Sequence, residues 1–147
     1  FPDPNLEKKF KKYITTHNLE DHVLFFDLLE YKKLTEKISN SLLGVMAMPQ
    51  GICKITYLSI PNRFYDTLVS GTPLLIDSIS PDVHHEVTSH KLGCSFDFDN
   101  FDKSITTLLE FLTNEKKYNE CLAPIEDYAK ANSWEKVSKV LDDIFKI

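Results

Sequence analysis

The segment Pro61–Ile76, PNRFYDTLVSGTPLLI, predicts a short helix, a tight stop and a buried strand in immediate succession. Proline favours the start of a helix, glycine suits its left-handed end, and a proline just beyond prevents continuation. Pro61, Gly71 and Pro73 follow this order. The first N–H groups of a helix lack intrahelical partners and mark the positive end of its dipole. We therefore expect an anion site, suited to phosphate, where this helix begins.

The predicted helix has an apolar and a polar side. Phe64, Leu68 and Val69 are expected on the face that meets the core. Asp66 lies one turn inside the helix, where a carboxylate either stabilises the positive end of the dipole or binds a ligand. The pattern alone leaves both roles open.

Helix and strand patterns alternate along the chain with short links, which is typical of an open parallel α/β sheet. Short apolar runs predict the strands His22–Asp27, Leu42–Met48, Pro73–Ile76 and Gly93–Phe98. A first helix is expected to begin near Asp3 and to end at His17 and Asn18. Further helices are expected over Leu29–Asn40, Asp82–Lys91, Glu115–Asn132 and the chain after a Ser133 cap. The chain from Phe101 is also expected to be helical, with Ile105, Leu108, Leu109 and Leu112 facing the sheet. The loop Pro49–Ser59 would leave the carboxyl end of a strand, where ligands bind in such sheets.

Composition favours a single soluble globular domain. The chain has 147 residues, 42% of them hydrophobic, which is enough for a core. Its net charge of −5 offers no broad positive field, so nucleic acid is not an expected partner. Three widely spaced cysteines without a CxxC pattern indicate neither a disulfide framework nor a zinc site and fit a reducing cytoplasm.

The sequence PNRFYDTLVSGTP resembles the C-terminal, nucleotide-sugar-binding domain of GT-B glycosyltransferases of the group 1, family 4-like type, whose pattern is similar to PNKxFEYLAAGxPVI. The similarity extends through Asn18–Phe26, Gly93–Asp97 and Asn132–Leu141, and so covers nearly the whole chain. The resemblance implies a Rossmann-like open parallel sheet flanked by helices. It also implies that residues 1–147 form one donor-binding domain, without the first strands of that domain and without the N-terminal acceptor domain.

The resemblance also assigns site residues. Asp66 stands where the family has an acid that binds the ribose hydroxyls, and Pro61, Asn62 and Arg63 fall where the loop meets the diphosphate. Leu28, in the loop that follows the strand expected at His22–Asp27, is expected to provide backbone contacts to the base. No catalytic residue is assigned, although Arg63 is a candidate for stabilising the leaving diphosphate. Neither a metal nor a cofactor is expected, and the donor substrate would be a nucleoside-diphosphate sugar.

The implied activity is transfer of a hexose to an acceptor, in surface polysaccharide biosynthesis, with this chain alone inactive. Its location would be cytoplasmic, or peripheral at the inner membrane face through segments outside these residues. The family's paired acids are incomplete, because Leu58 occupies the first position. Two alternatives stay open: a nucleotide-sugar epimerase of the same fold, and a nonenzymatic α/β interaction module.

Two further clusters are considered and set aside. His84, His85, Glu86 and His90 are spaced poorly for zinc, because adjacent histidines diverge by about 100° on a helix. Asp97 and Asp99 end a strand and begin a loop, and they are expected to be capping groups, with Asn100 capping the next helix.

Overall fold

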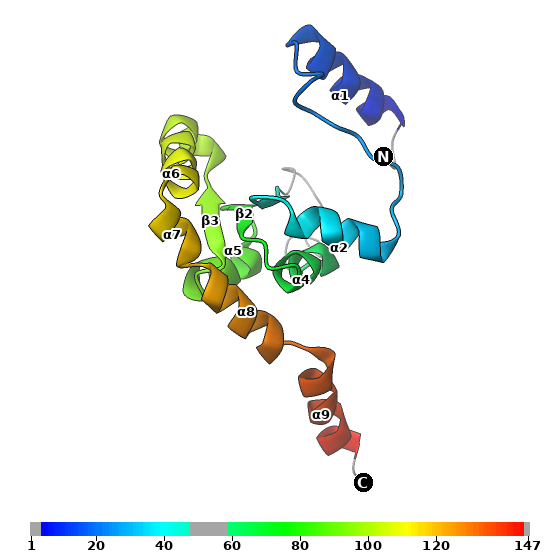
Figure 1. The fold of residues 1–147 in the computed structure, drawn as a ribbon, viewed down its shortest axis with the longest axis vertical. Coiled ribbons are helices and arrows are strands. Elements are labelled where there is room, and N and C mark those ends of the chain that lie inside the picture. The colour runs from blue at the N-terminus through cyan, green and yellow to red at the C-terminus, as the bar shows by residue number, and fades with distance from the viewer. Residues whose placement is uncertain (1–3, 48–58, 146–147) are drawn as a thin grey trace. The chain divides into compact units, whose positions relative to one another are not determined.

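A computed structural model describes residues 4–47 and 59–145. The chain divides into two compact units, Phe1–Glu30 and Tyr31–Ile147, which are considered separately (Figure 1). Within the described residues no helix is long and apolar enough to cross a bilayer. The expectation of a single domain over 1–147 stays a prediction.

The N-terminal unit consists of helix α1, Pro4–Thr16, and an irregular segment that follows it. The predicted end of the helix is confirmed: Asn18 adopts a left-handed φ of 54°, and the Leu19 N–H donates to the Ile14 carbonyl at 3.0 Å. Ile14 is buried, and the ring of Phe10 meets that of Phe25 edge to face with centroids 6.0 Å apart.

The predicted strand at His22–Asp27 is wrong, because the segment has no regular secondary structure. A strand requires hydrogen bonds to a neighbouring strand. The described part of this unit contains a helix and turns but no second strand to pair with the segment. Leu24, Phe25 and Phe26 are accordingly exposed.

The C-terminal unit contains three parallel strands in the order β1-β2-β3, with bounds β1 Gly44–Met46, β2 Leu74–Asp77 and β3 Gly93–Phe96. Met46 pairs with Ile76, and Ile76 with Ser95. The predicted α/β class with a small open parallel sheet flanked by helices is therefore confirmed, and it is compatible with a Rossmann-like fold. The third strand ends earlier than predicted because Asp97 starts a 3₁₀ turn.

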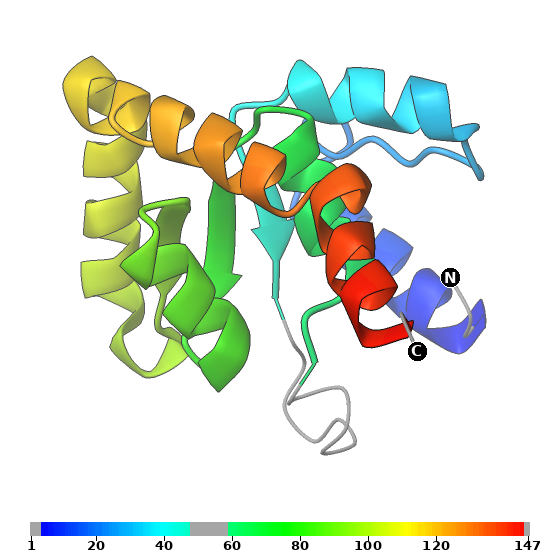
Figure 2. The ribbon, with the colours of Figure 1, turned by 90° about the horizontal axis from the view of Figure 1, so that it is seen from below.

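The described helices of this unit occur mostly where the sequence predicts them. Their bounds are α2 Tyr31–Ser39, α4 Asn62–Val69, α5 Pro81–Ser89, η1 Phe98–Asn100, α6 Phe101–Thr113, α7 Glu115–Asn119, α8 Leu122–Ala131 and α9 Trp134–Phe145. The single helix predicted over Glu115–Asn132 is wrong, since the chain turns between α7 and α8. That break brings Cys121 and Ile125 into the core and directs α8 across α4 (Figures 1 and 2).

The core lies between the sheet and its helices. Its buried apolar residues are Met46, Phe64, Leu68, Leu74, Ile76, Val83, Val87, Leu92, Phe111, Cys121 and Ile125. Three of the side chains predicted to face inward are instead exposed to a large extent. Val69 is 65% exposed because the buried face of α4 follows the i, i+3, i+4 spacing of Phe64, Thr67 and Leu68. Ile105 and Leu109 are exposed because α6 turns Ser104 and Phe111 inward.

Candidate functional site

Helix α4 carries the polar face that the sequence predicts. Asp66 follows Asn62 by four residues and Arg63 by three, so the three share one side of the helix, where Asn62 and Arg63 are exposed and Asp66 is half-buried. Phe64 and Leu68 are buried on the other side. Pro61 is the extended residue immediately before the helix, with φ −74° and ψ 152°, and its carbonyl accepts the Phe64 N–H at 2.9 Å. The structure thus brings four of the five predicted site residues together at one helix start.

The stop after this helix is also as predicted. Gly71 has φ +75°, and its N–H donates to the Leu68 carbonyl at 2.9 Å. A left-handed residue here ends α4 and lets Thr72 and Pro73 lead directly into β2. The turn at Gly71 therefore connects α4 to β2 by a short stretch of chain.

The Asp66 carboxylate has a partner that the sequence does not reveal. The phenol of Tyr31, at the start of α2, donates to Asp66 Oδ1 at 2.9 Å. This hydrogen bond and the nearby negative charge raise the pKa of Tyr31, so its hydroxyl stays protonated as a donor. Both side chains are accessible to solvent. Asp66 is therefore oriented at the surface by a residue 35 positions away.

Helices α2 and α4 lie beside each other. The buried Thr72 hydroxyl, just after α4, donates to the carbonyl of Ile38 in the last turn of α2 at 2.7 Å. A shallow groove of about 560 Å³ runs between them. Tyr31, Thr35, Ser39 and Ser70 contribute hydroxyl groups to its lining. The groove therefore begins at the Asp66 partner, and its surface is mostly apolar, because the Thr35, Ser39 and Ser70 hydroxyls donate to helix carbonyls.

A smaller, apolar hollow of about 190 Å³ lies at the carboxyl ends of the strands, lined in part by Val45, Leu75 and Phe96. Asp77, the last residue of β2, is buried beside it and accepts the Ile79 N–H at 3.1 Å. This is the edge at which ligands bind in open α/β sheets. The predicted ligand loop Pro49–Ser59 falls outside the described residues except for its last position.

Leu28 belongs to the N-terminal unit, where its side chain is fully exposed. Its predicted contact with the nucleotide base stays a prediction. The capping role of Asp97 is confirmed, because its carboxylate accepts the Asp99 N–H at 3.0 Å and the Asn100 amide at 2.6 Å. These bonds lower the pKa of Asp97. Asn100 occupies the predicted N-cap position of α6, but its side chain makes no capping hydrogen bond to the helix and instead donates to Asp97.

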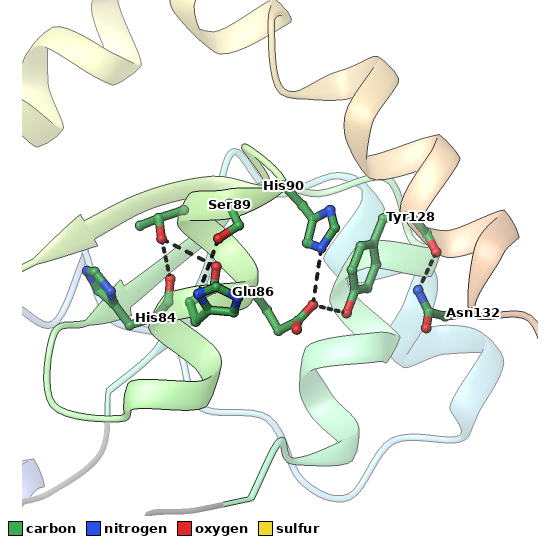
Figure 3. Close-up of polar contacts among 8 residues, drawn as sticks. His84, Glu86, Ser89, His90, Tyr128 and Asn132 are labelled. Atoms are coloured by element: carbon green, nitrogen blue, oxygen red, sulfur yellow. Dashed lines mark hydrogen bonds and ion pairs between the residues drawn. The ribbon is translucent and has the colours of Figure 1, made fainter.

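A second polar cluster joins α5 to α8 (Figure 3). The Tyr128 phenol donates to Glu86 Oε2 at 2.7 Å, and His90 Nε2 lies 3.7 Å from the same oxygen. The rings of His90 and Tyr128 meet edge to face at 5.1 Å. Burial, and then the bond to Glu86, raise the pKa of Tyr128. The phenol is therefore a persistent donor to this carboxylate.

Sequence reasoning singled out this part of α5 but missed the cluster. The spacing of Glu86 and His90 places them on one helix face, which is a signal in the sequence. Tyr128 is 42 residues from Glu86, and only the crossing of α8 brings it there. Among the described residues, no group of three or more His, Cys, Asp or Glu side chains is arranged to hold a metal ion.

Comparison of the chain with protein-family models, with curated proteins and with solved structures found no match. The fold and the two clusters therefore define the class of protein only broadly, as an α/β protein with a small open parallel sheet.

Proposed function

We propose that this chain is the donor-binding domain of a GT-B glycosyltransferase, which binds a nucleoside-diphosphate sugar and supplies it for transfer to an acceptor. The observation that carries the proposal is the polar face of α4, where Asn62 and Arg63 are exposed at the helix start and Asp66 is half-buried one turn further along. The sequence resemblance predicts these same residues for diphosphate and ribose. The parallel sheet behind the helix is the scaffold on which such sites occur.

In this proposal Asp66 binds the ribose. A carboxylate accepts two vicinal hydroxyl groups well, because charge-assisted hydrogen bonds are about twice as strong as neutral ones. The Tyr31 phenol already orients Asp66 through Oδ1, which reduces the freedom that ligand binding would otherwise remove. The groove between α2 and α4, which Tyr31 lines, adjoins this pair.

Arg63 and the N-terminus of α4 would act on the leaving group. The diphosphate gains negative charge as the glycosidic bond breaks, so a guanidinium and a helix dipole stabilise the transition state more than the ground state. No metal is required for this role. The general base and the acceptor would come from an N-terminal acceptor domain, and the chain alone would be inactive.

The same proposal includes the activity and the location that the sequence resemblance implies. They are hexose transfer in surface polysaccharide biosynthesis, a cytoplasmic location and, in one alternative, contact with the inner membrane face through other segments. A nucleotide-sugar epimerase of the same fold would share the ribose and diphosphate contacts. It would differ in taking its catalytic acids from outside this chain.

A specific observation favours a second candidate, a nonenzymatic interaction module. Helix α9 exposes large apolar side chains, with Trp134 71% and Phe145 74% exposed, and Val137 and Ile144 are exposed as well. Contiguous exposed apolar side chains are typical of surfaces that bind another protein. In the donor-domain proposal the acceptor domain would cover this surface, whereas an interaction module would use it without binding nucleotide.

The test is a calorimetric titration of the chain with UDP, GDP and ADP, repeated with Asp66→Ala and Arg63→Ala. We expect saturable binding of one nucleotide, weakened about tenfold or more by each substitution because each removes a charge-assisted contact. Asp102→Ala is the matched control, since Asp102 is an exposed acid in the first turn of another helix, and its affinity should be unchanged. Absence of saturable binding by the folded chain would contradict the donor-domain proposal and favour the interaction module.

A further inference from the structure

The Glu86–Tyr128 cluster borders an open pocket of about 740 Å³ whose described lining does not include Asn62, Arg63 or Asp66. We call it the Glu86 pocket. The polar and aromatic residues that line it are Tyr65, Glu86, His90, Asp127, Tyr128 and Asn132. These residues come from α4, and from α5 and α8, each with the residue that follows the helix. Figure 3 shows the Glu86, His90 and Tyr128 side chains converging between α5 and α8.

The charges around the Glu86 pocket favour a cation. Glu86 and Asp127 contribute carboxylates, and none of the described lining residues is a lysine or an arginine. His90 and Asn132, which also line the pocket, are the C-caps of α5 and α8. The carbonyl end of a helix carries the negative end of its dipole. The two helix ends and the two carboxylates therefore all attract a positively charged ligand.

The pocket also has aromatic walls. The rings of Tyr65 and Tyr128 line it, and Phe64 packs edge to face against both, with centroid distances of 5.2 and 6.0 Å. Phe64 is completely buried, so it supports the two tyrosines from the core. Aromatic faces attract cations, and the planar guanidinium group stacks on them while it donates to a carboxylate.

We propose that the Glu86 pocket binds a guanidinium group, with Glu86 as its carboxylate acceptor and Tyr65 and Tyr128 as its aromatic walls. Tyr128 holds one oxygen of Glu86 at 2.7 Å and so orients the carboxylate toward a planar donor. A metal ion is a poorer fit, because the described residues offer no group of three metal-ligating side chains. An anion is disfavoured by the carboxylates and the helix ends.

A guanidinium group has two sources, a free small molecule or an arginine side chain on a polypeptide. Agmatine and the tripeptide Gly-Arg-Gly, with blocked ends, represent the two sources. The tripeptide Gly-citrulline-Gly is the matched ligand control, since citrulline has nearly the same shape without the charge. Chemical shifts or heats are recorded for each ligand at pH 8, where an imidazole is ordinarily neutral and does not compete for the carboxylate.

We expect saturable binding of agmatine or the arginine tripeptide with a dissociation constant on the order of 1 mM or tighter. The citrulline tripeptide should bind at least about tenfold more weakly, because the charge-assisted hydrogen bond is lost. Similar affinity for the two guanidinium ligands would identify a small-molecule site. An arginine tripeptide about tenfold tighter than agmatine would identify a polypeptide partner.

The variant Glu86→Gln keeps the size of the side chain and an acceptor for Tyr128 but removes the charge, and it should weaken binding about tenfold. Glu126→Gln, on the same helix as Tyr128, removes an equal charge that pairs with Lys130 outside the pocket lining, and it should leave binding unchanged. If Glu86→Gln does not fold, the exposed Asp127→Asn replaces it, with a weakening of about threefold expected.

Equal binding of the arginine and citrulline peptides, or equal affinity of Glu86→Gln and Glu126→Gln, would overturn the proposal. Failure to bind either guanidinium ligand at millimolar concentration would do so as well. The inference does not depend on the proposed glycosyltransferase function. Nucleotide affinity should be the same in the Glu86→Gln variant, so the two proposals fail separately.

Discussion

Two apolar segments of this chain differ in structure although their compositions are similar. Strand β2 and the segment His22–Asp27 are both short runs of large apolar residues that end in an aspartate. In β2, Leu74 is completely buried between two hydrogen-bonded neighbours, whereas Leu24 is 73% exposed in an irregular segment. A strand therefore forms only where a neighbouring strand can pair with it, and β-prone residues alone are not sufficient.

Gly93→Ala, at the start of β3, tests the pairing between β2 and β3 and is expected to have the largest effect. A Cβ atom at this position would stand 1.9 Å from the Leu74 carbonyl oxygen, and the backbone φ of +155° disfavours a side chain. The β2–β3 pairing would have to shift, so we expect a loss of about 3 kcal/mol or more in the free energy of unfolding, measured in urea. Gly71→Ala, with φ +75° and no atom of the described residues within 4 Å, should cost only about 1 kcal/mol. Equal losses would contradict this explanation.

Leu74→Ala tests burial within β2 directly. Because Leu74 is fully buried in the core cluster, its truncation should cost about 3 kcal/mol in unfolding free energy. The neighbouring residue Leu75 points to the opposite face and is only half-buried. Leu75→Ala should therefore cost about half as much. A larger loss for Leu75 would place the principal core on the other face of the sheet.

The ionisation of the Cys94 thiol, on β3, tests how far the same sheet is shielded from solvent. Burial raises its pKa from 9.0 to about 11. Between these values the unfolded chain loses the thiol proton while the folded chain retains it, so Cys94 makes stability decrease as the pH rises from 9 to 11. Melting temperatures across this window should fall less steeply in Cys94→Ala than in the wild type. Parallel falls in the two proteins would show that the thiol is not shielded from solvent.

The smallest effect is expected in the segment His22–Asp27, which forms no strand. Leu24→Ser replaces an exposed side chain in a segment without strand pairing, so the free energy of unfolding should change by less than about 0.5 kcal/mol. Urea unfolding of the full chain measures it. A loss of more than about 1 kcal/mol would show that the segment is covered in solution, and the contrast with β2 would then disappear.

Much of the C-terminal unit could be predicted because its signals are local. Pro61, Gly71 and Pro73 mark the end of one element and the start of the next through backbone restrictions that each residue carries itself. The exposed face of α4 follows from helical geometry, so Asn62, Arg63 and Asp66 could be grouped without a structure. The direction of α6 was missed because its apolar residues occur on more than one side, and the sheet selects among them.

Within the C-terminal unit, local sequence signals were enough to predict most of the helices and strands, the helix stop at Gly71 and the residues that share one face of α4. Tertiary structure alone decided that His22–Asp27 is not a strand, that Tyr31 meets Asp66, and that Tyr128 meets Glu86. The physical reason is the range of each interaction. Backbone restrictions and helical periodicity act within a few residues, whereas strand pairing and side-chain contacts depend on which distant segments the packed core brings together.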